Sequence, residues 1–307
     1  MELSLIIMQK IAVMFLLVAI GYICARLGMI DEHTGKNLSS LSLRLVTPML
    51  IFSSYQSVSD GRIIRNLFLS FLLVFLAFAV QIPMAHLLIR KKNNPDYQTE
   101  RMSLIFPNCG FFGIPLIESL YGPEGAVYVT AYVTVFNILL WSVGTVIMSG
   151  KFSVRGFLKS LVSPAVVATV LGIGCLLLQL RIPDIVMEPV RYVANMNTPL
   201  AMIVAGATLS RTKLLPMLKN CRVYLVLAAK MLVIPAVAAL IISLVPLDDM
   251  LVMVPILATA CPTGAVCTMF AVMYDKNGPY ASQLFAITTL SSILTIPLIF
   301  LLAGVLV

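Results

Sequence analysis

The sequence consists largely of long apolar runs with short polar connections between them. An α-helix needs about 20 apolar residues to cross the hydrocarbon core of a bilayer. Hydrophobic residues make up 60% of the chain and charged residues 11%, a balance far from that of a soluble domain. Apolar and polar residues do not alternate, as they would in the strands of a membrane barrel. We therefore expect an all-α polytopic membrane protein with ten transmembrane helices, at residues 3–27, 38–56, 67–89, 102–121, 126–148, 164–180, 192–209, 223–247, 250–274 and 280–307.

The polar connections predict how the chain is oriented. Lys and Arg concentrate on the cytoplasmic side of membrane proteins. The odd-numbered connections hold 14 basic residues, namely Arg26, Lys36, Arg90, Lys91, Lys92, Arg101, Lys151, Arg155, Lys159, Arg211, Lys213, Lys219, Arg222 and Lys276. The even-numbered connections hold four, namely Arg62, Arg65, Arg181 and Arg191. This bias places the odd connections in the cytoplasm and both termini on the outer side of the cell membrane. It accounts for the net charge of +8 better than a nucleic-acid surface does.

A weak internal repeat relates the two halves of the chain. Tyr121, after the break in the fourth run, matches Tyr274 in the ninth at an offset of 153 residues. Pro48 in "VTPMLIFSS" and Pro199 in "NTPLAMIVAG" are 151 residues apart. Because five is an odd number, a second set of five spans enters the membrane upside down, as in many secondary transporters. The sequence thus predicts two inverted five-helix repeats, residues 1–154 and 155–307.

Helix-breaking residues lie in the middle of the fourth and ninth runs. The fourth contains "IFPNCGFFGIPL" and the ninth contains "ATACPTGAVCT". Non-helical backbone at membrane depth is tolerated only inside protein or beside a water-filled cavity. In the fourth run we expect half-helices at 102–106 and 115–121 with a break at 108–113, because proline fits best as the first residue of a helix. One proline kink would be ordinary packing, but two in corresponding runs predict a site.

If the two broken helices cross, two helix N-termini meet near the middle of the membrane. Helix N-termini carry partial positive charge and free N–H donors, which suit a carboxylate. The residues expected to bind substrate there are Asn108, Cys109, Gly110, Gly113, Pro115, Cys261, Pro262, Thr263 and Gly264.

Polar residues elsewhere in the runs are further candidates, since ionisable groups within a span are costly and often functional. Arg44 and Asn137 join the expected substrate-binding residues. The alternatives are that Arg44 snorkels to the cytoplasmic surface and that Asn137 makes a helix–helix hydrogen bond. Lys230 either snorkels or lies at depth. The roles of Lys10 and of Glu118, the only acid within a predicted span, stay open.

Several motifs together resemble the auxin efflux carrier family and its bacterial members. They are "GYICARLGMID", "VTPMLIF", "NCGFFGIPL", "ACPTGAVCTMFAVMYD" and "ITTLSSILTIPL", and the resemblance covers essentially the whole chain. It implies ten helices in two inverted repeats, with helices one, two, six and seven as a scaffold and the other six as a moving domain. It also implies organic-anion substrates such as malate, malonate or auxin, a homodimer, and a site lined by Asn108 and the residues around Pro262. The long cytoplasmic connection of many plant members is missing, which favours a bacterial-type member.

The favoured function is a secondary transporter of small organic anions, with alternating access around the site at the broken helices. The alternatives are a sodium- or proton-coupled symporter or antiporter of the same architecture, and a channel. A sodium–proton antiporter needs carboxylates at the midplane, yet all seven aspartates lie in connections. Without midplane acids, uniport or coupling through the charge of the substrate is favoured. The chain lacks an HExxH motif, a GxSxG elbow and a correctly spaced phosphate loop, so we expect no enzyme activity, no metal or other cofactor and no nucleic-acid partner.

Overall fold

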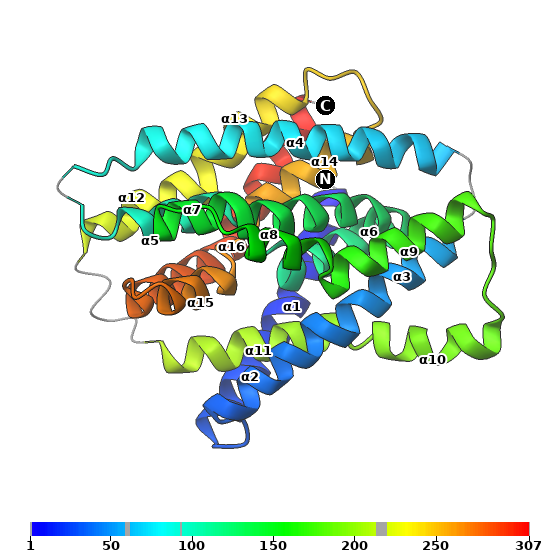
Figure 1. Cartoon of the computed structure of the whole chain (residues 1–307), viewed down its shortest axis with the longest axis horizontal. Helices are drawn as coiled ribbons and strands as arrows, with labels where there is room; N and C mark the ends of the chain where they lie inside the picture. Colours follow the sequence, from blue (N-terminus) through cyan, green and yellow to red (C-terminus); the bar gives the residue numbers. More distant parts are fainter. Residues whose placement is uncertain (1, 59–61, 93, 213–219, 307) are drawn as a thin grey trace.

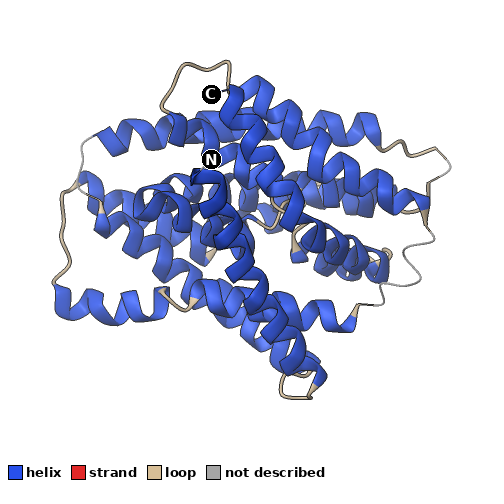
Figure 2. Ribbon diagram, turned by 180° about the vertical axis from the view of Figure 1, so that it is seen from behind, coloured by secondary structure: helices blue, strands red, loops and turns tan. Residues whose placement is uncertain are grey.

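The computed structural model describes residues 2–58, 62–92, 94–212 and 220–306, with side chains from Met8 onward. Within these residues the chain is helical and forms no β-strand (Figures 1 and 2). The α-helices are α1 (Glu2–Arg26), α2 (Glu32–Leu41), α3 (Thr47–Ser57), α4 (Arg62–Leu88), α5 (Tyr97–Ile105), α6 (Ile114–Leu139), α7 (Thr145–Ser149), α8 (Val154–Leu161), α9 (Pro164–Leu177), α10 (Asp184–Ala194), α11 (Asn197–Arg211), α12 (Cys221–Ala228), α13 (Ile234–Ile242), α14 (Asp249–Ala260), α15 (Ala265–Met273) and α16 (Gly278–Leu306). The π-helical turns are η1 (Ser42–Val46), η2 (Cys109–Gly113), η3 (Leu140–Gly144) and η5 (Ala229–Val233).

Long apolar helices confirm the all-α polytopic membrane class. In the described part of the chain, five segments are long and apolar enough to span a bilayer, namely Met8–Arg26, Arg62–Leu88, Cys109–Ser149, Cys221–Ile242 and Gly278–Leu306. The pair α8 and α9, bent by 42°, makes a sixth if it forms one span. The count of ten spans stays a prediction.

The structure has fewer long continuous helices than the sequence predicts spans, because some predicted spans are broken into two helices and others are joined into one. The predicted span 250–274 consists of the two short helices α14 and α15. The predicted spans 102–121 and 126–148 share the segment Cys109–Ser149, which is 41 residues long. Gly122 leaves helical geometry inside it (φ 65°, ψ −157°), a conformation that favours glycine.

Proline accounts for three of the π-helical turns. The turns η1, η2 and η5 each end two residues before a proline, at Pro48, Pro115 and Pro235 respectively. Proline has no N–H to donate, and its ring crowds the carbonyl one turn earlier. A wider turn before the proline relieves this crowding while the helix continues. Each of these prolines therefore widens a helix without ending it.

Several contacts join the two halves of the sequence, among them those of α1 with α11, of α3 with α9 and α10, and of α14 with α4 and α6. The α1–α11 pair is the closest, because a Cβ on Gly206 would lie 1.9 Å from the Val18 carbonyl oxygen and one on Gly21 would lie 2.1 Å from that of Ile203. Small residues permit such close approach in membrane helices. At the centre, α14 packs against α4, α6, α13 and α16, and every residue from 251 to 260 is buried. The chain thus encloses the break that follows α14.

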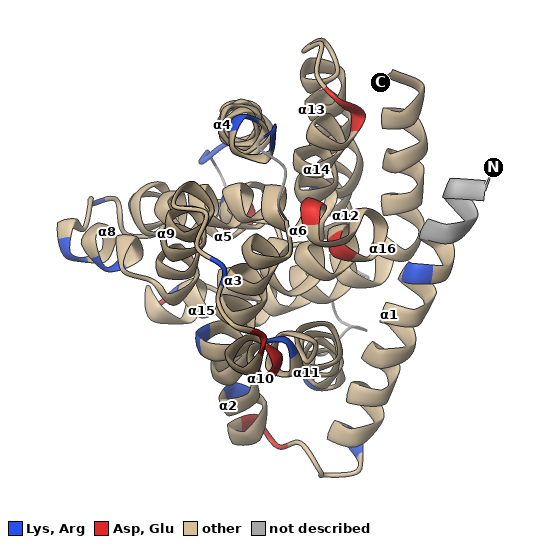
Figure 3. Cartoon of the chain, turned by 90° about the vertical axis from the view of Figure 1, so that its right-hand side faces the viewer, with Lys and Arg blue, Asp and Glu red and all other residues tan. Residues whose placement is uncertain are grey.

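Charged side chains are sparse on the molecule. Figure 3 shows most Lys, Arg, Asp and Glu residues near helix ends and in connections, with long uncharged stretches between them. This distribution fits helices that cross an apolar layer. Lys213 and Lys219, which count toward the seventh connection, lie outside the described residues.

Candidate functional site

The breaks in the fourth and ninth predicted spans lie against each other. Non-helical backbone occupies residues 106–108 after α5 and residues 261–264 after α14, and we call these two stretches the junction. The Asn108 N–H donates to the Pro262 carbonyl oxygen at 2.7 Å. The Gly264 N–H donates to the Phe106 carbonyl oxygen at 2.9 Å. These bonds form an isolated antiparallel bridge centred on Pro107 and Thr263.

The second stretch of the junction is tightly held. The Thr263 N–H donates to Thr288 Oγ1 of α16 at 3.1 Å, and the Thr263 hydroxyl donates to the Ser103 carbonyl oxygen of α5 at 3.1 Å. A Cβ on Gly264 would lie 3.2 Å from the carbonyl oxygens of both Phe106 and Pro107. The close approach of the two backbones thus favours a glycine here, and Thr263 supports the junction.

The first break lies earlier than the sequence predicts. The expected break at 108–113 is wrong, because residues 109–113 form the π-helical turn η2, which continues into α6. The Asn108 carbonyl oxygen accepts from the N–H groups of Phe112 and Gly113 at 2.9 and 3.0 Å, so Asn108 precedes the first helical residue. Pro115 lies within the helix, where the preceding π-turn accommodates its ring.

Groups without a described partner lie at the end of the first stretch, in η2 and at the start of α15. No hydrogen bond of the Asn108 side chain occurs among the described residues, and this side chain is 6% exposed. A Cβ on Gly110 would meet no atom within 4 Å, so there is open space beside it. Ala265 and Val266, at the start of α15, are half-buried. The first N–H groups of a helix have no partner within the helix, so both starts offer donors here.

Lys230 lies where α5 and α14 end, and of the two alternatives for this residue the structure favours a buried position over snorkelling. It is 0% exposed, and its Nζ donates to the carbonyl oxygens of Leu104 in α5 (3.4 Å) and Thr259 in α14 (3.2 Å). Within a continuous helix these oxygens would accept from the N–H groups of Asn108 and Thr263, which are bonded elsewhere. Lys230 therefore satisfies the two carbonyls that the breaks leave without partners.

Three thiols line the inside of the junction. Cys109, Cys261 and Cys267 are buried. The Cys261 Sγ donates to the Leu257 carbonyl oxygen at 3.3 Å, and the Cys267 Sγ lies 3.4 Å from that of Met102. A Cβ on Gly113 would lie 3.3 Å from the Cys261 Sγ, so a glycine allows η2 to pack against the end of α14. These residues pack the junction rather than line an accessible surface.

The two remaining site residues, Arg44 and Asn137, make no contact described with the junction. Arg44 is exposed on η1. Asn137 donates from Nδ2 to the Val133 carbonyl oxygen of its own helix at 2.7 Å. Of the residues left open, Lys10 is exposed on α1 and Glu118 is half-buried on α6.

A buried carboxylate, Glu100, lies on the same half-helix that Lys230 contacts, and the sequence reasoning missed it. It is 0% exposed and accepts two 2.7 Å bonds from the Arg222 guanidinium. Tyr280 Oη (3.1 Å) and Asn94 Nδ2 (2.8 Å) also donate to it. The predicted span begins after Glu100, so the sequence suggested a solvated connection. Two of its partners, Arg222 and Tyr280, come from distant parts of the chain and leave no local signal.

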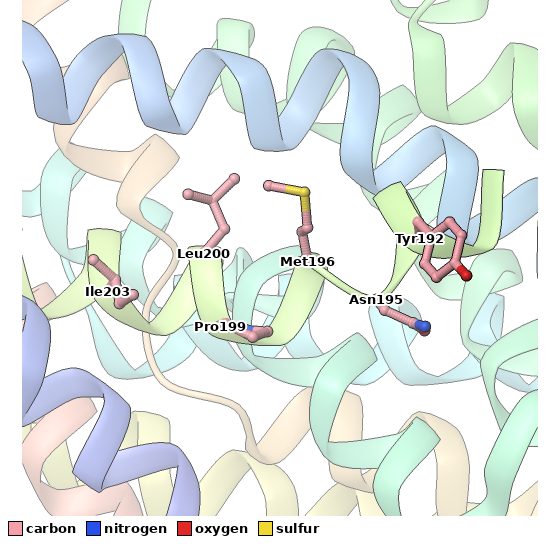
Figure 4. Close-up of a pocket in the computed structure, with 6 residues that line it drawn as sticks. All are labelled: Tyr192, Asn195, Met196, Pro199, Leu200 and Ile203. Carbon is pink, nitrogen blue, oxygen red and sulfur yellow. The ribbon is translucent and has the colours of Figure 1, made fainter. Parts of the chain in front are cut away.

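An apolar groove lies along α10 and α11. Its volume is about 330 Å³, and it is lined by residues of α10, α11 and their connection (Figure 4), namely Tyr192, Asn195, Met196, Pro199, Leu200 and Ile203. No charged side chain lines it, and none of the expected site residues does. It is a poor match for an anion.

Comparison with known proteins identifies the family to which this chain belongs. The sequence model of a family described as membrane transport protein matches residues 6–155 and again residues 151–300. An uncharacterized transporter of Methanothermobacter thermautotrophicus is 24% identical over 295 residues, covering 94% of this chain and 96% of the relative. An uncharacterized transporter of Methanocaldococcus jannaschii is 23% identical over 304 residues, covering 95% and 97%.

Proposed function

Because the chain belongs to the membrane transport protein family, which is the auxin efflux carrier family that its motifs resemble, we propose that it is a secondary transporter of small organic anions in the cell membrane. Its substrates are carboxylates such as malate or malonate, or auxin-like acids. The observation that carries this proposal is the junction, where two helices start beside the paired stretches, the Asn108 amide makes no described hydrogen bond and the space at Gly110 is open.

The chemistry of this space favours a carboxylate. Two helix N-termini bring partial positive charge and free N–H donors to one place. The Asn108 amide can donate to a carboxylate oxygen in the same way. The acid nearest in sequence on the neighbouring half-helix, Glu100, is bound to Arg222 and is therefore not free to repel an anion.

The proposed architecture has ten spans in two inverted repeats, 1–154 and 155–307, whose broken helices cross at the junction. A scaffold of spans one, two, six and seven is supported by the packing of α1 on α11 and of α3 on α9 and α10. The remaining spans form the moving domain, supported by the mutual packing of α4, α6, α13, α14 and α16. Movement of one group against the other would open the site to each side in turn.

A binding screen tests the substrate class. Purified protein is heated with malate, malonate, indole-3-acetate or the uncharged amide malonamide, each with and without sodium. Specific binding of one carboxylate raises the melting temperature by mass action, while malonamide has no effect. Equal shifts with the carboxylates and with the amide, or a shift that needs sodium alone, would contradict an anion site.

A reporter fusion tests the proposed orientation with both termini outside. A reporter that is active only in the cytoplasm, fused after the last residue, is expected to give no signal, and fusion in the connection between α7 and α8 is expected to give a strong one. The reverse pattern would exclude this topology.

A further inference from the structure

Lys230 is a buried cation without a carboxylate partner among the described residues. The elements that pack against η5 are α5, α12, α13, α14 and α16. Arg222 and Tyr280 both bind Glu100. Arg101 of α5 donates to the Ile89 carbonyl oxygen, and Asp249 is the first residue of α14, at the end far from Thr259. The titratable groups near Lys230 include the buried thiols Cys109, Cys261 and Cys267.

The helix ends at the junction do not balance the charge of Lys230. Each helix N-terminus is equivalent to about +0.5 charge and each C-terminus to about −0.5. Two ends of each kind meet at the junction, so their contributions cancel. Protonated Lys230 then leaves the junction with one net positive charge, which one singly charged anion would neutralise.

We propose that Lys230 couples transport to protons, so that one proton crosses with each singly charged anion. This inference rests on the proposed function. The anion binds while Lys230 is protonated, and the loaded junction is neutral. After the anion leaves, the ammonium releases its proton to water on the same side, because a buried charge without a counterion is unfavourable. The empty, neutral junction then returns, and Lys230 takes up a proton on the first side.

A purely structural role for Lys230 makes different predictions. If the ammonium only ties the ends of α5 and α14, any residue that keeps those bonds preserves net transport. Coupling instead requires a group that can lose its charge. Arginine can reach carbonyl oxygens but stays protonated. The substitution Lys230→Arg therefore distinguishes the two roles.

The experiment uses the full chain in proteoliposomes with radiolabelled indole-3-acetate, which carries a single negative charge at neutral pH, and protein-free vesicles as the background. Exchange of internal for external anion involves only the loaded junction, whereas net uptake requires the empty junction to return. For Lys230→Arg we expect exchange within about threefold of wild type and net uptake reduced about tenfold or more, because the empty junction keeps its charge. Lys36→Arg, at an exposed position of α2, is the matched control and is expected to leave both rates unchanged.

Wild-type protein gives a second readout that does not depend on the variant. Coupled movement of one proton and one anion is electroneutral, so an imposed potential leaves the accumulation ratio unchanged. If one uncompensated charge crossed instead, about 100 mV would change that ratio about 50-fold. Accumulation that follows the potential, or wild-type net uptake by Lys230→Arg, would overturn the coupling. If wild-type protein shows neither binding nor exchange of any tested carboxylate, the proposed function itself fails.

Discussion

The two stretches of the junction occupy corresponding places in the two halves of the chain but differ in what they leave free. In the first, the Asn108 amide has no described partner and Gly110 borders open space. In the second, the Cys261 thiol bonds within its own helix and Gly264 is enclosed by two carbonyl oxygens. One repeated motif thus provides the contacts for a ligand, and the other provides the support that holds those contacts in place.

Gly264 tests the supporting side and is expected to give the largest effect. In Gly264→Val the branched side chain would press on the carbonyl oxygens of Phe106 and Pro107, and moving them disturbs the bridge between the two stretches. We expect a loss of about 3 kcal/mol in the free energy of unfolding, near the upper end for overpacking. Thermal unfolding in detergent measures it. If Gly264→Val were as stable as the wild-type protein, the two backbones could not be closely packed at this position.

Asn108 tests the binding side. Asn108→Leu removes an amide that can donate to the carboxylate, and a hydrogen bond to a charged group contributes about 2 kcal/mol. We expect affinity to fall about 30-fold with little change in melting temperature. Cys261→Ala, at the matching position of the other repeat, is expected to change affinity less than about twofold because its thiol is bonded away from the space. A similar loss of affinity in Asn108→Leu and Cys261→Ala would show that the two stretches do not differ in ligand binding.

Gly110 tests whether the open space belongs to the ligand. Gly110→Leu fills that space without meeting any protein atom at its Cβ. We expect folding to be retained, since leucine favours a helix more than glycine does. The apparent affinity for the carboxylate is expected to fall about tenfold, because a displaced ligand loses at least one good hydrogen bond. Unchanged uptake kinetics would place the ligand elsewhere.

Arg44 gives the smallest expected effect and sharpens the boundary of the site. Its side chain is exposed on η1, so neither Arg44→Gln nor Arg44→Lys is expected to change the Michaelis constant by more than about twofold. Uptake kinetics at several ionic strengths provide the measurement. A large increase for Gln with recovery in Lys would return Arg44 to the site.

The predicted half-helices show why the location of the junction could be read from the sequence while its boundaries could not. Prolines and glycines in two apolar runs indicate broken helices, because each removes a backbone donor or weakens a helix locally. The start of the second half-helix was misplaced at Pro115, since a π-turn can absorb a proline. Whether a proline ends or only widens a helix depends on what its neighbours pack against.

The sequence by itself determined that this chain is a helical membrane protein, since the length and composition of apolar runs decide which segments can enter a bilayer. It also indicated where those helices break, because backbone conformation is a local property of proline and glycine. Only the tertiary structure decided that Lys230 joins two half-helix ends, that Glu100 is buried against Arg222, and that Asn108 stays free while Thr263 does not. These outcomes depend on partners that lie 25 to 160 residues away, or on their absence. From the sequence of an apolar run one cannot tell whether a polar group will be hydrogen-bonded by a distant segment or will stay free to bind a ligand.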